Sequence, residues 1–170
     1  ISYKTLNKDN PKLNCRLQGL NKFSPIRIIL DNNLEMKITS YIFKTANKKK
    51  TIIFYNEANK KKILLFKRKG IQVIKSKLKK NKYFDLKLIL KKLYIIGCRN
   101  LLVEAGNELS KSFLRKRLFN QFYLFKSPIK LSKLVAYKEF NSFKILSQNY
   151  KSKSKIDTKL GKDSIILYKK

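Results

Sequence analysis

The chain has 170 residues, 43% of them hydrophobic, which suits one domain with one sizeable core. Its 42 lysines and arginines against 10 acids give a formal net charge of +32. The lysines are scattered through nearly every segment beside abundant Asn and Ile, which favours codon bias in an AT-rich genome over a nucleic-acid footprint. We therefore do not expect a nucleic-acid partner.

The chain has no histidine, and its two cysteines, Cys15 and Cys98, lie far apart in the sequence. This excludes a Cys/His zinc site and a histidine general base, so we expect no metal. It also leaves no disulfide framework, which favours the reducing cytoplasm. No apolar run reaches the length of a membrane span, and no secretory signal pattern opens the sequence, so we expect no membrane partner.

Residues 1–5 are predicted to end a strand, and residues 6–11 form a polar loop that closes on Asp9-Asn10-Pro11, a turn signal. Arg16 follows a few residues later. An arginine there can bind a phosphate or carboxylate, although a surface arginine is the ordinary case on so basic a chain.

Residues 26–31 predict a strand whose end carries polar residues, Asp31 and Asn32. Open α/β sheets bind ligands at that edge, although a simple Asx turn also explains the pattern. Residues 39–43 predict the start of a short helix, residues 63–66 lie in a helix closed by Gly70, and strands are predicted at 51–55 and 71–74. The clearest helix begins after Asp85 and ends before Gly97, with apolar spacing at Leu86, Ile89, Leu90 and Leu93.

Residues 100–113 organise the functional prediction. An apolar run, residues 101–103, predicts a strand buried on both faces, and Glu104 follows it directly. Ala105 and Gly106 suit a turn, and Asn107 can cap a helix whose N-terminus would attract a phosphate; the apolar positions of that helix are Leu109, Phe113 and Leu114. Taken alone, the pattern is more typical of an ordinary strand-to-helix connection with a solvated glutamate.

Residues 119–125 predict an aromatic strand that stops at Pro128, and residues 142–150 and 164–168 predict two more strands. Alternating strands and helices before residue 115 indicate parallel strands joined by right-handed crossovers. The predicted fold class is α/β, a mostly parallel sheet flanked by helices with antiparallel C-terminal strands.

In their order and spacing, these segments resemble the reductase domain of the bifunctional riboflavin-biosynthesis deaminase/reductase, the RibD family, whose fold is like that of dihydrofolate reductase. The matching pieces are Thr5, 9–13 and Arg16, then 25–31, 85–86, 102–106 and Leu109, then 122–128, Gly161, Asp163 and Leu167. The resemblance spans nearly the whole chain and implies a single reductase domain over residues 1–170.

The resemblance implies NADPH-dependent reduction of 5-amino-6-(5-phosphoribosylamino)uracil, a phosphorylated pyrimidine, by a homodimer. Hydride would pass to the sugar carbon that carries the amine. By family position, Leu13, Arg16 and Glu104 would face the substrate, with Glu104 as the candidate catalytic residue. The NADPH site would be lined by Thr5, Asp9, Asn32, Gly106, Asn107, Glu108, Leu109, Ser110, Lys111 and Ser112.

The sequence also departs from the family. Asn120 and Gln121 stand where acids are usual, and Ser2-Tyr3-Lys4 replaces a glycine-containing approach to Thr5. The early Lys-x-Ala-x-Ser-x-Asp-Gly segment is absent, so we expect a domain that is incomplete at its N-terminus. A zinc deaminase domain could lie upstream in the full chain.

Two alternatives remain open. The first is a basic RNA-binding or ribosome-associated protein, suggested by the charge and by nine tyrosines and eleven phenylalanines. The second is a pteridine or folate reductase of the same fold, because a fold does not fix its substrate. Arg16 with Glu104 suits a phosphorylated ribosylamine better than a pterin.

Overall fold

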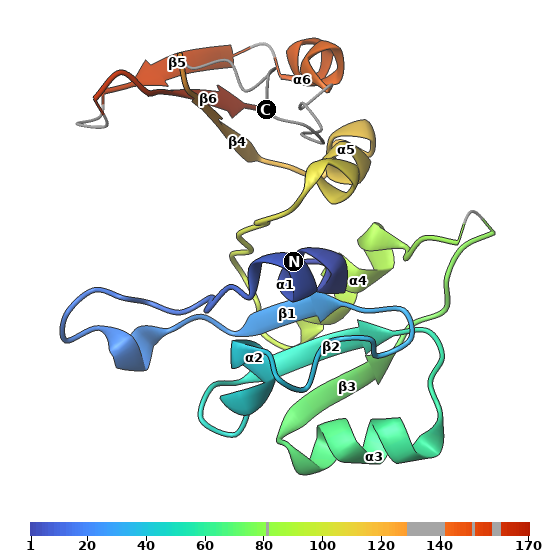
Figure 1. Cartoon of the computed structure of the whole chain (residues 1–170). Coiled ribbons are helices and arrows are strands. Elements are labelled where there is room, and N and C mark those ends of the chain that lie inside the picture. The colour runs from blue at the N-terminus through green and yellow to red at the C-terminus, as the bar shows by residue number, and fades with distance from the viewer. Residues whose placement is uncertain (81, 129–141, 151, 158–160) are drawn as a thin grey trace. The chain divides into compact units, whose positions relative to one another are not determined.

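The computed structural model describes residues 1–80, 82–128, 142–150, 152–157 and 161–170. Within these ranges the chain forms two compact units, Ile1–Ala105 and Gly106–Lys170 (Figure 1). The prediction of a single domain over the whole chain stays a prediction.

The first unit is built on a parallel three-stranded sheet of order β1-β2-β3. Strands β1 (Arg27–Leu30), β2 (Thr51–Tyr55) and β3 (Ile71–Lys75) pair in register, with Ile29 opposite Ile53 and Ile53 opposite Val73. All five residues of β2 are buried, as expected for the central strand of a sheet covered on both faces. The three predicted strands are confirmed.

Helices cover both faces of this sheet (Figure 1). One core cluster joins Leu6, Phe43 and Phe66 from α1 (Tyr3–Asp9), α2 (Tyr41–Lys44) and α3 (Lys60–Arg68) to the β1–β3 face that carries Ile29 and Ile53. The other cluster packs α4 (Leu86–Ile95) against Ile52 and Phe54. A short 3-10 helix, Asn21–Phe23, lies before β1.

The ends of α2, α3 and α4 follow the local sequence. Ser40, Asn59 and Asp85 each accept a first-turn backbone N–H through the side chain, which satisfies donors that have no partner inside the helix. After α3 and α4, Gly70 and Gly97 adopt φ of 81° and 97°, a region that glycine enters without steric cost.

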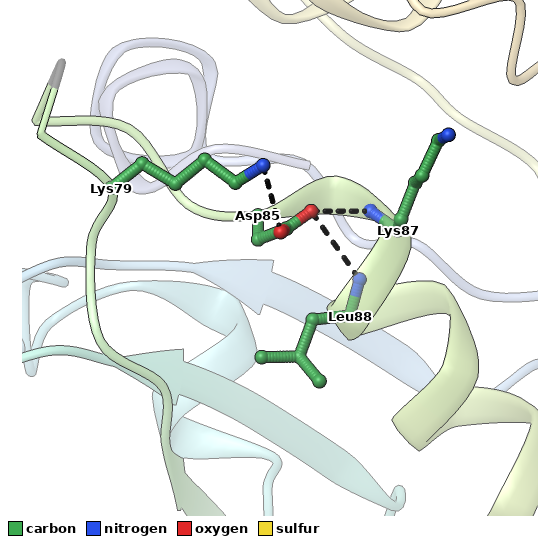
Figure 2. Close-up of polar contacts among 4 residues, drawn as sticks. All are labelled: Lys79, Asp85, Lys87 and Leu88. Atoms are coloured by element: carbon green, nitrogen blue, oxygen red, sulfur yellow. Dashed lines mark hydrogen bonds and ion pairs between the residues drawn. The ribbon is translucent and has the colours of Figure 1, made fainter.

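The loop before α4 is joined to its first turn through Asp85 (Figure 2). One carboxylate oxygen accepts the backbone N–H of Lys87 at 3.1 Å and of Leu88 at 3.5 Å, and the other lies 2.8 Å from the Lys79 ammonium. The Lys79 hydrogen bond, with smaller contributions from the backbone donors, lowers the pKa of Asp85 below its usual value.

Arg27 is fully buried at the start of β1. Its guanidinium donates to the hydroxyls of Thr45 and Thr51 at 2.8 Å each and to the carbonyls of Lys49 at 3.0 Å and Ile42 at 3.4 Å. The side chain therefore ties β1 to β2 and to α2.

The second unit pairs three antiparallel strands in the order β4-β6-β5. These are β4 (Gln121–Lys126), β5 (Ser152–Ile156) and β6 (Ser164–Lys169), accompanied by α5 (Asn107–Arg115) and α6 (Phe143–Asn149). The core of this unit gathers Leu114, Leu124, Leu146 and Tyr150, and the Tyr150 hydroxyl donates to the Phe119 carbonyl at 3.0 Å. Antiparallel C-terminal strands are confirmed.

Four local predictions were wrong. Residues 3–9 form helix α1 rather than a strand end and loop, because Ser2 caps the segment and Leu6 is buried. Residues 101–103 form no strand, and Leu102 is 85% exposed, because no strand of the described residues pairs with them. Residues 143–149 are the helix α6, and Gly106 rather than Asn107 precedes α5.

Among the residues that the structure describes, no helix is long and apolar enough to cross a membrane.

Replacing Asp85 by Ala should destabilise the first unit more than replacing Lys79 by Ala does, because the cap satisfies orphan helix donors whereas the ion pair is partly solvated. Urea unfolding of both variants beside wild type measures this. Since the folded-state pKa of Asp85 is lowered, its contribution is present above the unfolded pKa, roughly 3.9, and is lost as pH falls through the folded value. Equal losses in the two variants at pH 7 would show that the ion pair, not the cap, matters.

Candidate functional site

Thr5 and Asp9 are both on α1, four residues apart, and so lie on one side of the helix. The Ser2 hydroxyl oxygen accepts the Thr5 backbone N–H at 3.3 Å and lies 3.1 Å from the Thr5 hydroxyl oxygen. Thr5 is half-buried and Asp9, the last residue of the helix, is exposed. The Asp9 carboxylate is therefore open to a ligand.

The loop after β1 is held from inside by Asp31, which is fully buried. Its two carboxylate oxygens accept the backbone N–H groups of Glu35 and Met36, each at 2.8 Å. Burial raises the pKa of Asp31, and these backbone donors oppose that shift.

Asn32, the next residue, is half-buried at the carboxyl end of β1. Its carbonyl accepts the N–H groups of Asn56 at 2.8 Å and Glu57 at 3.0 Å, just beyond the end of β2. Asn32 therefore has a fixed backbone at the edge where parallel sheets bind ligands, as its place in the sequence predicted.

Two side chains of α1 and that of Asn10, its C-cap, contact the same loop, and these contacts connect α1 to the segment that begins with Asn32. Asn7 donates to the Glu35 carbonyl and accepts the Lys37 N–H, both at 2.9 Å, and Asn10 accepts the Tyr41 N–H at 2.8 Å. A hydrogen bond to Glu35, with smaller contributions from burial and charge, raises the pKa of Tyr3 to about 12. Sequence reasoning missed these contacts; their spacing of four and three residues is a signal only once residues 3–9 are recognised as a helix.

The two other substrate candidates of this region differ in their surroundings. Leu13, at φ 46°, packs against the core cluster that contains Leu6. Arg16 is exposed, so its guanidinium is accessible to an anion. The structure brings Leu13 next to the α1 side of the sheet and leaves Arg16 at the surface.

Glu104 is exposed, in the extended segment that follows α4. It lies near the Ile1 nitrogen, which donates to the Ile28 carbonyl of β1 at 3.0 Å. Glu104 therefore lies near the outer edge of β1, within the same unit as Thr5, Asp9 and Asn32.

The remaining candidates, residues 106–112, open helix α5 in the second unit. Gly106 precedes the helix with φ −68° and ψ 174°, a conformation that any residue can adopt. The effect of glycine at this N-cap position is therefore that no side chain accepts a hydrogen bond from the first turn of α5. The Ser112 hydroxyl donates to the Glu108 carbonyl at 2.9 Å, and Glu108 is the acid of the first turn. A helix opening of this kind suits a phosphate, with Glu108 as a charge that opposes it.

The described residues contain no group of three or more acidic, cysteine or histidine side chains placed to hold a metal ion. Cys15 and Cys98 are half-buried free thiols.

The chain is 31% identical to the riboflavin biosynthesis protein RibD of Aquifex aeolicus over 170 residues, all of this chain and 45% of that protein. It is 26% identical to the protein of the same name from Chlamydia trachomatis over 130 residues, 75% of this chain and 34% of that protein. It therefore spans less than half the length of these relatives.

Two solved structures share the fold. Acinetobacter baumannii RibD superposes with a TM-score of 0.69 at 20% identity, covering 99% of this chain and 45% of that one. A pyrimidine reductase-like protein from Corynebacterium diphtheriae superposes with a TM-score of 0.72 at 15% identity, covering 99% of this chain and 73% of that one. These neighbours confirm the predicted α/β class with its parallel sheet and antiparallel C-terminal strands.

The family model of the RibD C-terminal domain matches residues 1–146, most of the chain. On this match, and on the identity to the Aquifex protein, the chain belongs to the RibD C-terminal domain family.

Proposed function

We propose that this chain catalyses the NADPH-dependent reduction of 5-amino-6-(5-phosphoribosylamino)uracil to 5-amino-6-(5-phosphoribitylamino)uracil in riboflavin biosynthesis. The observation that carries the proposal is the match of residues 1–146 to the RibD C-terminal domain. The names of the relatives and of the pyrimidine reductase-like neighbour support it. We further propose a cytoplasmic homodimer, with a deaminase domain upstream in the full protein.

Each unit, taken by itself, offers groups of the kind that bind part of a dinucleotide. Asn32 offers a fixed position at the carboxyl edge of the parallel sheet, and Thr5 and Asp9 share one side of α1, which is hydrogen-bonded to the same loop. Gly106 opens α5 without a capping side chain, so the first turn of that helix can face a phosphate, with residues 107–112 as its cradle. When bound, NADPH supplies the hydride that the reduction requires.

The substrate side is assigned to Leu13, Arg16 and Glu104. Arg16 presents a forked donor that matches a sugar phosphate, and Leu13 gives an apolar contact beside it. Glu104 is an exposed carboxylate that makes no hydrogen bond within the described residues, so it can accept hydrogen bonds from the sugar or amine and stabilise positive charge that develops there. The chain therefore orients its ligands and supplies electrostatic stabilisation, without a covalent intermediate.

The first test is a fluorescence titration of the 170-residue chain with NADPH, NADH and a short RNA at physiological salt. We expect saturable NADPH binding about tenfold tighter than NADH binding, because the additional phosphate adds charge-assisted hydrogen bonds. RNA binding that falls steeply with salt, together with no response to NADPH, would replace the reductase proposal by the nucleic-acid alternative.

Replacing Arg16 by Ala should weaken binding of the phosphorylated substrate about tenfold or more and leave NADPH binding unchanged, because one charge-assisted contact is lost. Calorimetry with the substrate, and with ribose 5-phosphate as a stable fragment of it, measures this. Arg68→Ala is the matched control, since Arg68 is exposed at the end of α3 and the charge change is the same. If substrate binding and NADPH binding weakened equally in Arg16→Ala, the cause would be general misfolding, and the assignment of Arg16 to the substrate site would lose its support.

Replacing Glu104 by Gln should lower turnover about tenfold to a hundredfold with the NADPH Kd unchanged, because the amide keeps the shape but loses the charge. Steady-state turnover beside an NADPH titration measures this. Glu57→Gln is the control, an exposed glutamate in the same unit. Wild-type turnover in Glu104→Gln would exclude a role for its charge.

A further inference from the structure

We propose that Asn7 is a positioning residue for the dinucleotide: it holds α1 against the loop of residues 31–41 and so fixes Thr5 and Asp9 relative to Asn32. The inference rests on the proposed function, because those three residues are its NADPH contacts in this unit. Asn7 itself is not among them.

Helix α1 cannot set its own orientation. It has seven residues, fewer than an isolated helix needs to be stable in water, and Leu6 is its one buried residue. Tyr3 and Ile1 add partly buried apolar contacts, and Ser2 pairs with Leu30 of β1, so the amino end of the helix is fixed. The orientation of the carboxyl end, which carries Asp9, depends in addition on polar contacts with the neighbouring chain.

Asn7 supplies such a contact with both ends of its amide. The Nδ2 atom donates to the Glu35 carbonyl and the Oδ1 atom accepts the Lys37 N–H, each at 2.9 Å. Donor and acceptor meet complementary backbone groups two residues apart, as in a strand pairing, so the amide has one orientation that satisfies both. Substitution by any apolar residue loses both bonds.

The loop that Asn7 binds is anchored independently of α1. Asp31 holds Glu35 and Met36 from inside at 2.8 Å each, and the Asn32 carbonyl is bonded to the chain beyond β2. Asn7 therefore connects the helix to a fixed point, and Asn10 adds a second bond, to Tyr41, at the far end of the loop.

The side of α1 that makes these contacts is not the side of the candidate ligands. At 3.6 residues per turn, Thr5 and Asp9 lie on the side of the helix roughly opposite Asn7. Contacts on the first side hold the second side in place without occupying it. Loss of the Asn7 side chain should therefore weaken the contacts of Thr5 and Asp9 with the dinucleotide, although Asn7 does not contact it.

The test uses the full 170-residue chain with Asn7→Ala, Asn7→Asp and, as a control, Asn21→Ala, the same change at an exposed asparagine away from the loop. NADPH Kd is measured by fluorescence, with the rise in Tm at saturating NADPH as a second readout. We expect Asn7→Ala to raise Kd about tenfold with kcat at saturating NADPH unchanged. Asn7→Asp, which keeps the acceptor for Lys37 but loses the donor to Glu35, should fall between Ala and wild type.

The outcomes separate the two proposals. Failure of the unaltered chain to bind NADPH would overturn the proposed function and this inference together. NADPH binding by wild type with the same Kd in Asn7→Ala would overturn the inference alone. A lower Tm in Asn7→Ala with unchanged Kd would assign Asn7 to stability and equally overturn its positioning role.

Discussion

The first unit depends on a buried cation that has no carboxylate beside it among the residues that the structure describes. Within the described part of the chain, the Arg27 guanidinium donates to hydroxyl and carbonyl oxygens of Thr45, Thr51, Ile42 and Lys49, and burial lowers its pKa. An arginine can be buried in this way only if its donors are satisfied, so the positions of these oxygens are constrained together. Because they belong to β2, to α2 and to the connection between them, one side chain joins these elements to the amino end of β1. The pairing of β1 with β2 then carries the alignment to the carboxyl ends, where Asp31 and Asn32 begin the candidate site.

The parts of this unit that the sequence predicted are those whose signals are local. Strand β2 was predicted from an apolar run alone, and helix α4 from its apolar spacing between Asp85 and Gly97. Strands β1 and β3 and helix α3 were predicted from local signals of the same kinds. The position of Asn32 at the sheet edge followed from its place after β1. Arg27 was placed within a predicted strand, but nothing in its neighbours indicated burial, because its partners Thr45 and Thr51 come from later in the chain.

The wrong predictions lie in segments whose apolar residues fit both a strand and a helix, or in a segment that would need a neighbouring strand to pair with. In residues 142–150, alternating apolar residues suggested a strand, yet Leu146 and Tyr150 have helical spacing and are the buried pair. In residues 1–5 the alternation of Ile1, Tyr3 and Thr5 suggested a strand, whereas Ser2 is the N-cap of a helix. Residues 101–103 are apolar enough for a strand, but a strand also needs a neighbour to pair with, and composition cannot supply one. The assignment of Glu104 rests on family position, since its exposure and its proximity to Ile1 define a location rather than a role.

The acids of the first unit divide into those that have a structural task and those that have none. In so basic a chain a carboxylate attracts cations everywhere, so an acid without a structural task is informative. Asp31 holds the loop, Asp85 caps α4 and Glu35 binds Tyr3, which accounts for three acids of the first unit by local structure. Asp9, Glu57 and Glu104 are exposed, and their carboxylates make no hydrogen bond or ion pair within the described residues of that unit. Of these three, Asp9 lies on a helix tethered to the sheet edge and Glu104 lies on the segment near β1, so these two combine a free carboxylate with a position in the candidate site. Charge alone does not place Asp9 there, because the contacts of Asn7 hold the helix that carries it against the loop after β1.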